Sequence, residues 1–201
     1  MSKKTLLITG TSGFIGYNFL KYILTKNYYI IDILREKNKK NYKLKKLKKK
    51  YPKNYKSIFF SNNRQLERKI KKLKINYFIN FATLYKNNHE YNDIFNFIKS
   101  NILFPTLMYD LISQKATKVI NFGSMMQHKS SEKFESKNLY SATKNAFEMI
   151  SNFYSYKEKN TKFYNLKLYE SFGKNDNRKK LIPTIITNYK KKKTTKIISK
   201  N

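Results

Sequence analysis

The stretch TGTSGFIG, from Thr9 to Gly16, holds three of the five glycines of this 201-residue chain. It follows the apolar run KTLLIT and precedes GFIGYNFLKYILTKN, in which apolar residues recur at helical spacing. Gly10 would allow a tight turn, Gly13 would let the backbone approach a diphosphate, and Gly16 would let the helix pack close to the strand. The phosphates would lie at the N-terminus of the helix, where N–H groups and the helix dipole favour anions. The stretch therefore predicts a dinucleotide site.

The rest of the chain alternates apolar runs with amphipathic stretches, which predicts an α/β fold of the Rossmann type with a doubly wound parallel sheet. We expect strands at 4–9, 28–34, 57–60, 76–82, 117–124 and 161–169, and helices at 13–27, 64–74, 91–114 and 138–157. The lysine run at 35–54 is expected to form a solvated helix and loop. We assign 1–170 to a dinucleotide-binding domain and 171–201 to an incomplete C-terminal substrate lobe, with one helix near 180–190 and a short strand at 195–198.

The formal net charge of +32 has two explanations, an anionic partner and codon composition. Lysine supplies 40 of the 44 basic residues, and Asn, Ile, Tyr and Phe are also frequent, as AT-rich codons would produce. Proteins that read nucleic acids rely on arginine for bidentate contacts, and that enrichment is missing. We therefore favour codon composition and expect no specific nucleic-acid partner.

The chain contains no cysteine, so it has no disulfide, thiolate nucleophile or thiolate metal site. Its N-terminal apolar run is too short for a signal peptide, and no stretch approaches the length of a membrane span. We expect a cytoplasmic protein with no membrane partner and no metal site.

A second motif, YSATK, places Tyr140 and Lys144 four residues apart, on one face of a helix. Ser124 ends the fifth expected strand, at the carboxyl edge where such sheets bind ligands. A tyrosine can exchange a proton with a carbonyl or alcohol oxygen, but its ordinary pKa of about 10 is high for this role. A neighbouring ammonium would favour the phenolate. We expect Lys144 to do this while holding the nicotinamide ribose, and Ser124 to bind the substrate oxygen.

These motifs, together with FINFAT, SNILFPT, INFGS and NLKLYESFG, run in order over nearly the whole chain. The chain resembles the extended short-chain dehydrogenases/reductases, within the NAD-dependent epimerase/dehydratase family, which act on nucleotide-activated sugars. The resemblance is strongest to 4-ketoreductases and epimerases of deoxysugars that are similar to CDP-abequose synthase and serve surface polysaccharide synthesis.

The resemblance implies catalytic roles for Ser124, Tyr140 and Lys144. It implies that Asn80, Ala82 and Thr83 line the cofactor cleft and that Asn101 supports the helix of the active site. With the glycine motif, the residues expected to contact the dinucleotide are Gly10, Ser12, Gly13, Phe14, Ile15, Gly16, Arg35, Phe81, Ala82, Thr83, Asn101, Tyr140 and Lys144. Met125, Asp176 and Arg178 are expected near the sugar nucleotide.

The choice between NADP and NAD depends on the register of the second strand. An acid at its end pairs with the ribose hydroxyls of NAD, whereas an arginine accommodates the 2′-phosphate of NADP. Without a gap, that position is Leu34, followed by Arg35, which favours NADP. A connection two residues shorter would place Asp32 there and favour NAD.

The sequence predicts an NAD(P)-dependent reduction or epimerisation of a nucleotide-activated 4-keto sugar. Because the substrate lobe is short, we expect the chain to bind the dinucleotide but to turn over the sugar nucleotide poorly. The related enzymes pair through two long helices, so a homodimer is expected through 91–114 and 138–157. The alternatives are a catalytically weak dinucleotide-binding regulator on the same fold and a basic nucleic-acid-binding protein.

Overall fold

The computed structural model describes residues 3–128, 135–174, 176, 178 and 180–195. The chain divides into two compact units, Met1–Tyr169 and Glu170–Asn201, and each is described by itself. Among the described residues of the second unit, the regular element is the helix α7, Leu181–Lys190. The strand expected at 195–198 falls almost entirely outside the described residues. The roles assigned to the two parts of the chain remain predictions.

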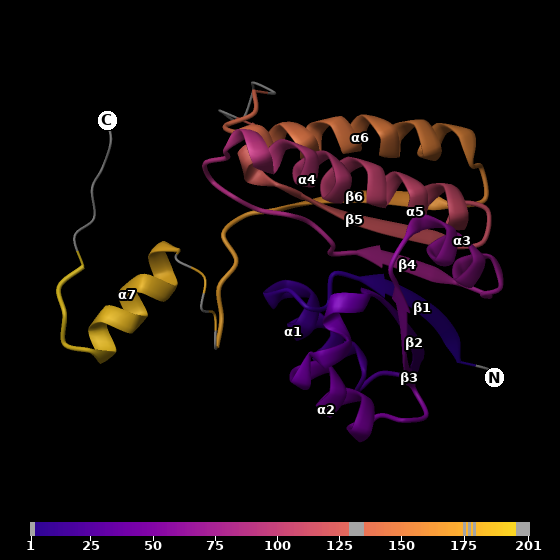
Figure 1. The fold of residues 1–201 in the computed structure, drawn as a ribbon, viewed down its shortest axis with the longest axis horizontal. Helices are drawn as coiled ribbons and strands as arrows, with labels where there is room; N and C mark the ends of the chain where they lie inside the picture. Colours follow the sequence, from indigo (N-terminus) through magenta and orange to yellow (C-terminus); the bar gives the residue numbers. More distant parts are fainter. Residues whose placement is uncertain (1–2, 129–134, 175, 177, 179, 196–201) are drawn as a thin grey trace. The chain divides into compact units, whose positions relative to one another are not determined.

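The first unit is built on one parallel sheet of six strands in the order β3-β2-β1-β4-β5-β6 (Figure 1). The strands are β1 Lys4–Thr9, β2 Tyr28–Arg35, β3 Tyr55–Phe60, β4 Tyr77–Asn80, β5 Lys118–Ser124 and β6 Lys162–Leu168. The central strands are continuous apolar runs because helices cover both faces of the sheet. Leu6, Leu7 and Ile8 of β1 are all buried, although they point to alternate faces. The structure confirms the expected doubly wound fold.

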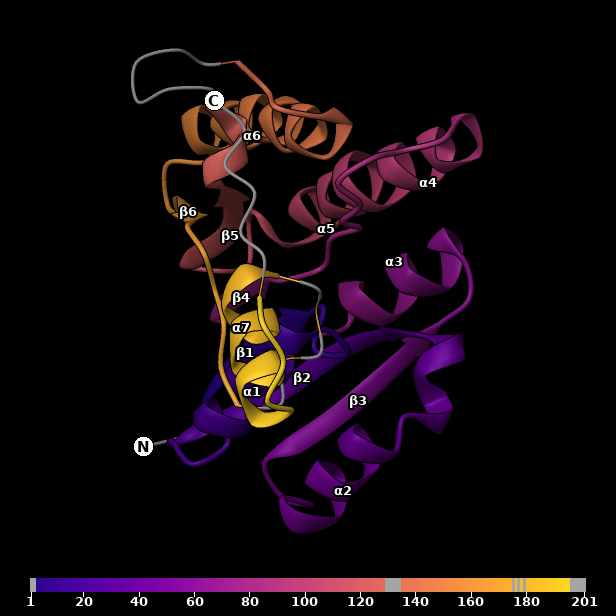
Figure 2. The same cartoon turned by 90° about the vertical axis from the view of Figure 1, so that its left-hand side faces the viewer.

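Two clusters of buried side chains divide the helices between the faces of the sheet (Figures 1 and 2). Helices α1, Phe14–Ile23, and α2, Tyr42–Lys50, cover one face. On the other face lie α3, Asn63–Lys71, α5, Phe104–Ile112, and α6, Leu139–Lys157. The lysine run is largely solvated, as expected, but α2 still buries Leu44 and Leu47 against the sheet.

The helix expected at 91–114 is present but not uniform. The short 3₁₀ turn η2, Tyr91–Asp93, leads into α4, Ile94–Ile98, and the π-helical segment η3, Lys99–Leu103, joins α4 to α5. The π segment ends just before Pro105, which has no N–H to donate to the preceding turn. Two further 3₁₀ segments are η1, Glu36–Lys40, and η4, Met125–Gln127.

The buried face of this helix keeps a helical spacing through the π segment. Its members recur at intervals of one or two turns, and they include Phe97, Asn101, Met108 and Ile112. Four other apolar residues of 91–114 are exposed, namely Ile94, Phe95, Ile98 and Leu103. The apolar residues of this helix therefore do not all face the core.

Candidate active site

The order of the strands reverses between β1 and β4, which lie side by side at the centre of the sheet. The chain passes from β1 to α1 on one face, and from β4 toward α4 and α5 on the other. In doubly wound sheets, ligands bind beyond the carboxyl ends of the strands at this switch point. The glycine-rich turn and the segment Phe81–Thr83 follow these two strands directly.

The backbone of the glycine-rich turn fits closely against its neighbours. Gly10 has a φ of 78°, which residues with a side chain rarely adopt, and an added Cβ would collide with the backbone of Phe81 and Ala82. An added Cβ at Gly16 would collide with the backbone of Gly10. At Gly13 the nearest atom to an added Cβ would be the oxygen of Gly10, at 3.4 Å. The turn is thus compact on its inner side and open at Gly13, as a diphosphate site requires.

The first turn of α1 also suits an anion. Gly13 is the N-cap of this helix, so no side chain caps it, and the first turn carries no acidic residue. Ser12 is exposed beside the cap, and Phe14 and Ile15 are half-buried in the first turn. The dipole and the N–H groups of α1 therefore favour a phosphate here.

Below this turn, a buried carboxyl group joins three elements. Asp32 Oδ2 accepts hydrogen bonds from Thr11 Oγ1, at 2.6 Å, and from the Tyr55 hydroxyl, at 2.7 Å. Asp32 Oδ1 is buried and has no hydrogen-bond partner among the described residues. Burial raises the pKa of Asp32 to about 7, although both hydroxyl groups act to lower it. Asp32 thus connects the glycine-rich turn, through Thr11, to β2 and β3.

The register of β2 shows where Asp32 and Arg35 lie, the two residues considered for the choice between NAD and NADP. Asp32 pairs with Ile8 inside the sheet, and its carboxyl group is buried. Arg35 ends β2 and is exposed, and its Nη2 donates to the Ser100 hydroxyl at 3.1 Å. Asp32 therefore does not end β2, whereas Arg35 does and follows Leu34 as expected without a gap. The choice between NADP and NAD stays a prediction.

The catalytic residues expected from the sequence meet at the carboxyl end of β5. Ser124 is the last residue of this strand, and its hydroxyl accepts from Met126 N of the short segment η4. Tyr140 lies in the first turn of α6, which Asn138 caps by accepting from Ser141 N. The Tyr140 phenol lies close enough to Ser124 and Thr83 for both of them to lower its pKa.

Lys144 lies one helical turn after Tyr140 and is almost completely buried. Its ammonium donates to the Phe122 carbonyl at 2.9 Å, and burial lowers its pKa to about 8. Burial raises the pKa of Tyr140, hydrogen bonding to Ser124 lowers it, and the charge of the neighbouring Tyr85 raises it. The expected lowering of the Tyr140 pKa by Lys144 is therefore not found, because burial dominates and the Lys144 ammonium is bonded to a carbonyl.

Asn101 connects the two sides of this site from the π segment η3. Its Nδ2 donates to Thr143 Oγ1 of α6, at 2.9 Å, and to the Leu84 carbonyl, at 3.0 Å. Its Oδ1 accepts from Leu84 N, at 2.7 Å, and from Thr83 Oγ1, at 3.1 Å. The side chain thus uses its full capacity to join α6 to the segment after β4, in agreement with a supporting role.

The side chains that follow β4 differ from the expected cleft lining. Asn80 is buried, and its amide bonds Thr9, Asn121 and the Ala82 N–H, so it holds the connection instead of facing a ligand. Phe81 stacks on Phe122 with ring centroids 4.4 Å apart. Ala82 is half-buried and Thr83 is exposed.

Three substrate contacts were expected from the sequence. Met125 is half-buried in η4, directly after Ser124. In the second unit, Arg178 Nε donates to Asp176 Oδ1 at 2.7 Å, and Arg178 Nη2 donates to Asp176 Oδ2 at 2.6 Å. The structure thus pairs Asp176 with Arg178, and their contact with a sugar nucleotide stays a prediction.

Within the described residues, no group of three or more His, Asp or Glu side chains could hold a metal ion. No helix in the described part of the chain is both long enough and apolar enough to cross a membrane.

Residues 6–201 match the NAD dependent epimerase/dehydratase family, and the chain belongs to it. No curated protein sequence is significantly similar to the chain. Among solved structures, the fold is similar to that of a dTDP-glucose 4,6-dehydratase from Bacillus anthracis in complex with NAD, with a TM-score of 0.73 and 22% identity over 94% of this chain. It is also similar to the UDP-Glc/GlcNAc 4-epimerase of Campylobacter jejuni, with a TM-score of 0.71 and 16% identity over 82% of this chain.

A third similar structure is a short-chain dehydrogenase/reductase from Burkholderia multivorans with bound NADP, with a TM-score of 0.66 and 13% identity over 81% of this chain. The chain spans 62% of the dehydratase, 53% of the epimerase and 77% of the dehydrogenase. At these identities the similarity concerns the fold.

Some residues that build the site carry no pattern in the sequence. Asp32 was expected only as an alternative ribose contact, and Tyr55 lay outside the expected third strand. The hydrogen bonds that Thr11 and Tyr55 donate to Asp32 depend on strand pairing. Thr143 lies between Tyr140 and Lys144 in YSATK. Its position on the same helical turn as Tyr140 is the sequence feature that could have indicated its role. No sequence pattern indicated the role of Tyr85, because its contact with Tyr140 depends on the path of the loop after β4.

Proposed function

We propose that the protein is an NAD(P)-dependent enzyme that reduces, or epimerises by a redox route, a nucleotide-activated 4-keto sugar. The observation that carries the proposal is the convergence of Ser124, Tyr140 and Lys144 at the carboxyl end of β5. This end of the sheet lies beside the switch point where the glycine-rich turn suits a diphosphate. We further propose that the reaction takes place in the cytoplasm and that, as the resemblance implies, it serves the synthesis of surface polysaccharide.

Each residue has a role that its environment supports. Tyr140, kept protonated by burial, donates its phenolic proton to the carbonyl oxygen of the substrate. Ser124 donates a hydrogen bond to the same oxygen. The bound dinucleotide supplies the hydride. Lys144, with a pKa of about 8, holds the nicotinamide ribose and retains its charge at neutral pH, where a cation favours negative charge developing near Tyr140.

The segment after Ser124 favours reduction or epimerisation over dehydration. Elimination of water from a sugar needs an acid for the leaving hydroxyl and a base for the carbon-bound proton. Met125, Met126 and Gln127 follow Ser124 directly, and none of them can fill these roles.

Arg35 supports NADP as the preferred cofactor, with NAD as the alternative. Its guanidinium lies at the exposed end of β2, and the lysines of η1 follow it. A guanidinium can donate two parallel hydrogen bonds to a phosphate, as the 2′-phosphate of NADP offers. Leu34, at the position where NAD-binding relatives are expected to carry an acid, is buried and offers no acceptor.

The proposal is tested by incubating the protein with NADPH and a panel of CDP-, dTDP- and UDP-linked 4-keto sugars, with products identified by mass spectrometry. Reduction or epimerisation of one member at a rate that requires Tyr140 supports the proposal. Saturable binding of NADPH without turnover of any member would favour the alternative, a dinucleotide-binding regulator. DNA binding that persists at raised salt, without NADPH binding, would favour the nucleic-acid alternative, because counterion release weakens nonspecific binding.

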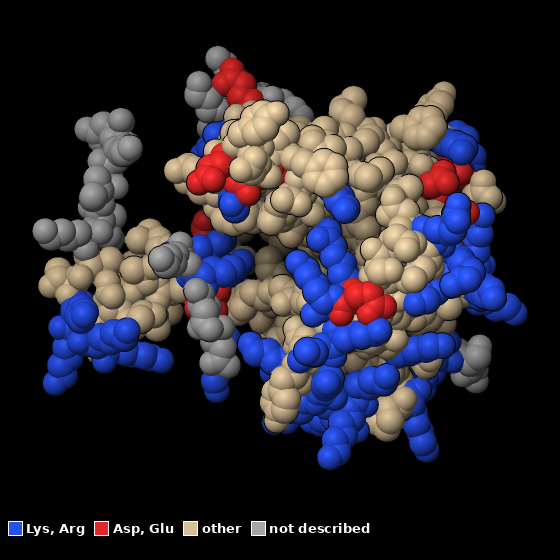
Figure 3. All heavy atoms as spheres, in the orientation of Figure 1, with Lys and Arg blue, Asp and Glu red and all other residues tan. Residues whose placement is uncertain are grey.

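We further propose that the protein forms a homodimer through α4, η3 and α6, which contact one another. These elements expose large apolar side chains, which water disfavours and a second copy would cover. They are Ile94, Phe95, Ile98 and Leu103 from α4 and η3, and Met149, Phe153 and Tyr156 from α6. Lysines and arginines gather over α2 and are sparse over α4 and α6 (Figure 3).

The dimer is tested by sedimentation of the Phe95→Glu and Phe153→Glu variants. Each places a charge among these apolar side chains and should dissociate the dimer. Tyr22→Glu, at an exposed tyrosine of α1, is the matched control and should leave the mass unchanged. A monomeric wild-type protein would contradict the proposal.

A further inference from the structure

Tyr85 lies on the connection between β4 and η2, and its ring packs against the ring of Tyr140. The two ring centroids are 4.9 Å apart and the planes are at 88°, the edge-to-face geometry that aromatic pairs prefer. The Tyr85 side chain is 49% exposed, whereas Tyr140 is 8% exposed. Tyr85 therefore stands on the solvent side of the pair and contributes to the cover over the catalytic phenol.

The backbone before Tyr85 is fixed by the active-site amide. Asn101 bonds both the N–H and the carbonyl of Leu84, the residue directly before Tyr85. The same amide donates to Thr143, one helical turn after Tyr140. One side chain thus sets the separation between the backbone that carries Tyr85 and the helix that carries Tyr140.

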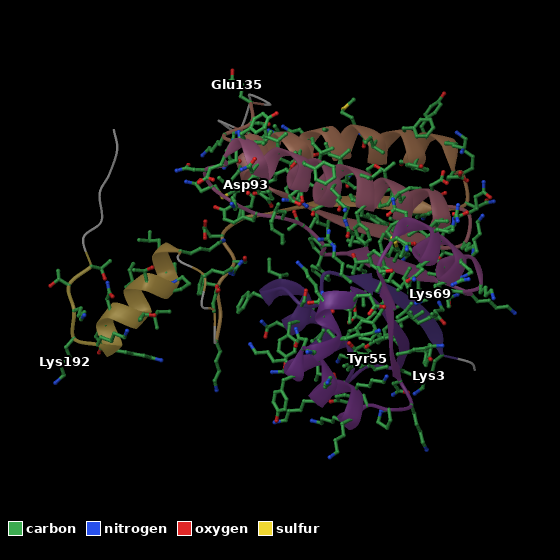
Figure 4. All side chains as sticks on the ribbon, viewed as in Figure 1. Lys3, Tyr55, Lys69, Asp93, Glu135 and Lys192 are labelled. Atoms are coloured by element: carbon green, nitrogen blue, oxygen red, sulfur yellow. The ribbon has the colours of Figure 1, made fainter. Side chains whose placement is uncertain are left out.

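The backbone after Tyr85 is fixed as well. Lys86 forms an ion pair with Asp93, with Nζ 2.6 Å from Oδ1, and Figure 4 shows Asp93 near the start of α4. The Asn87 carbonyl accepts from Asn138, the N-cap of α6, at 3.2 Å. The loop is therefore attached on both sides of Tyr85 to the helices of the active site, and the contact between the two rings is built into the fold.

We propose that Tyr85 is a positioning residue of the active site, which shields Tyr140 from water and so keeps its hydroxyl available as a proton donor to the substrate carbonyl. The inference rests on the proposed function for the role of that proton, but the contact itself does not. The electrostatics agree with it, since burial and the proximity of Tyr85 both raise the pKa of Tyr140. Removing the Tyr85 ring should admit water to Tyr140 and lower that pKa.

The test uses the full chain with 3,5-difluorotyrosine at position 140, so that a single residue reports its ionisation by fluorine NMR. The ring fluorines lower the intrinsic pKa and bring the titration to a milder pH. Tyr85→Ala should lower the pKa of this residue by on the order of one unit. Tyr85→Phe keeps the ring and removes only the ionisable hydroxyl, so it should lower the pKa less than Tyr85→Ala does. Tyr156→Ala, at an exposed tyrosine of the same helix, is the control and should produce no shift.

Circular dichroism checks the fold of each variant, and Tyr85→Leu replaces Tyr85→Ala if the latter does not fold. An unchanged titration in the folded variant, or an equal shift in Tyr156→Ala, would overturn the inference. NADPH binding, followed by its fluorescence, should be the same in Tyr85→Ala and in the wild type, because Asn101 and Lys144 remain. Absence of NADPH binding in the wild type would contradict the proposed function and leave the fluorine result valid, so the two failures are distinguishable.

Discussion

Beside the glycine-rich turn, Asp32 Oδ2 accepts two hydroxyl donors, and Asp32 Oδ1 has no partner among the described residues. Beside the catalytic helix, both polar atoms of Asn101 make two hydrogen bonds each. Both side chains are buried and each joins elements that are distant in sequence. A neutral amide can form hydrogen bonds with all its neighbours without carrying a charge. Burial destabilises the ionised form of an acid, and the two hydroxyl donors offset only part of this cost. We therefore expect the hydrogen bonds of Asn101, on the catalytic side of the site, to persist as the pH changes. We expect the cofactor side, around Asp32, to weaken as Asp32 ionises.

The largest expected effect tests whether Tyr140, on the catalytic side, is the proton donor of the reaction. Tyr140→Phe removes the proton donor and keeps the ring, so turnover should fall by roughly 10²–10⁴-fold. NADPH binding should change little, because the glycine-rich turn and Lys144 are untouched. Steady-state kinetics and fluorescence titration measure the two quantities. Tyr156→Phe on the same helix is the control, and full activity in Tyr140→Phe would remove the basis of the assignment.

The second effect concerns the acid under the glycine-rich turn. The pKa of Asp32 is raised from an ordinary value near 3.8 to about 7, so the native state binds more protons than the unfolded state between these values. Stability should therefore be greatest below about pH 4 with respect to this group, and be lost as pH rises to about 7, by on the order of 4 kcal/mol. Urea unfolding measured from pH 4 to pH 8 reports the change.

The pKa shifts of three other groups differ from that of Asp32 in direction or in range. Ion pairing lowers the pKa of Asp93 and of Asp176, and Lys144 titrates near pH 8. Asp32→Asn should abolish the loss of stability between pH 4 and pH 7, whereas Asp110→Asn, at an exposed position of α5, should preserve it. A wild-type protein whose stability rises over this interval would show that Asp32 is ionised at little cost, and the contrast with Asn101 would fail.

The third effect tests the amide of the catalytic side. Asn101→Leu leaves Leu84 N–H, the Leu84 carbonyl and the Thr143 hydroxyl without their partner, and each buried unsatisfied group costs about 1–3 kcal/mol. Water and local relaxation will recover part of this cost, so we expect a loss of about 2–3 kcal/mol in the free energy of unfolding. Asn96→Leu, at an exposed position of α4, should change it by less than about 0.5 kcal/mol. Equal effects of the two substitutions would mean that the amide does not hold the site together.

The sequence predicted these two sides unequally. The glycine spacing and the pair Tyr140 and Lys144 are local patterns, and they predicted the dinucleotide turn and the catalytic residues directly. The hydrogen bonds that support the glycine-rich turn are not local in sequence, because Asp32 contacts Tyr55 only through the pairing of β2 with β3. The pKa of Tyr140 could not be predicted either, since its direction depends on burial, which the spacing of YSATK does not contain.

The helix that carries Asn101 shows the same limit. The sequence predicts one helix over 91–114, without the π segment that the structure has at Lys99–Leu103. Asn101 lies in this segment and makes four hydrogen bonds from it. The irregular segment thus carries the residue that joins the two sides of the site.

The smallest expected effect concerns the choice between NADP and NAD on the cofactor side. Arg35 is exposed at the end of β2, and a charge-assisted hydrogen bond to a phosphate at such a site contributes about 1.4 kcal/mol. Arg35→Ala should therefore weaken NADPH binding roughly tenfold and leave NADH binding nearly unchanged. Arg64→Ala, at an exposed arginine of α3, is the control for a general loss of positive charge and should affect both cofactors alike and weakly. The difference should shrink at high salt, because solvent screens an exposed pair. If Arg35→Ala weakens NADH and NADPH equally, the guanidinium acts through its contact with Ser100 and the shape of η3, and the choice of cofactor must then be made elsewhere along the dinucleotide.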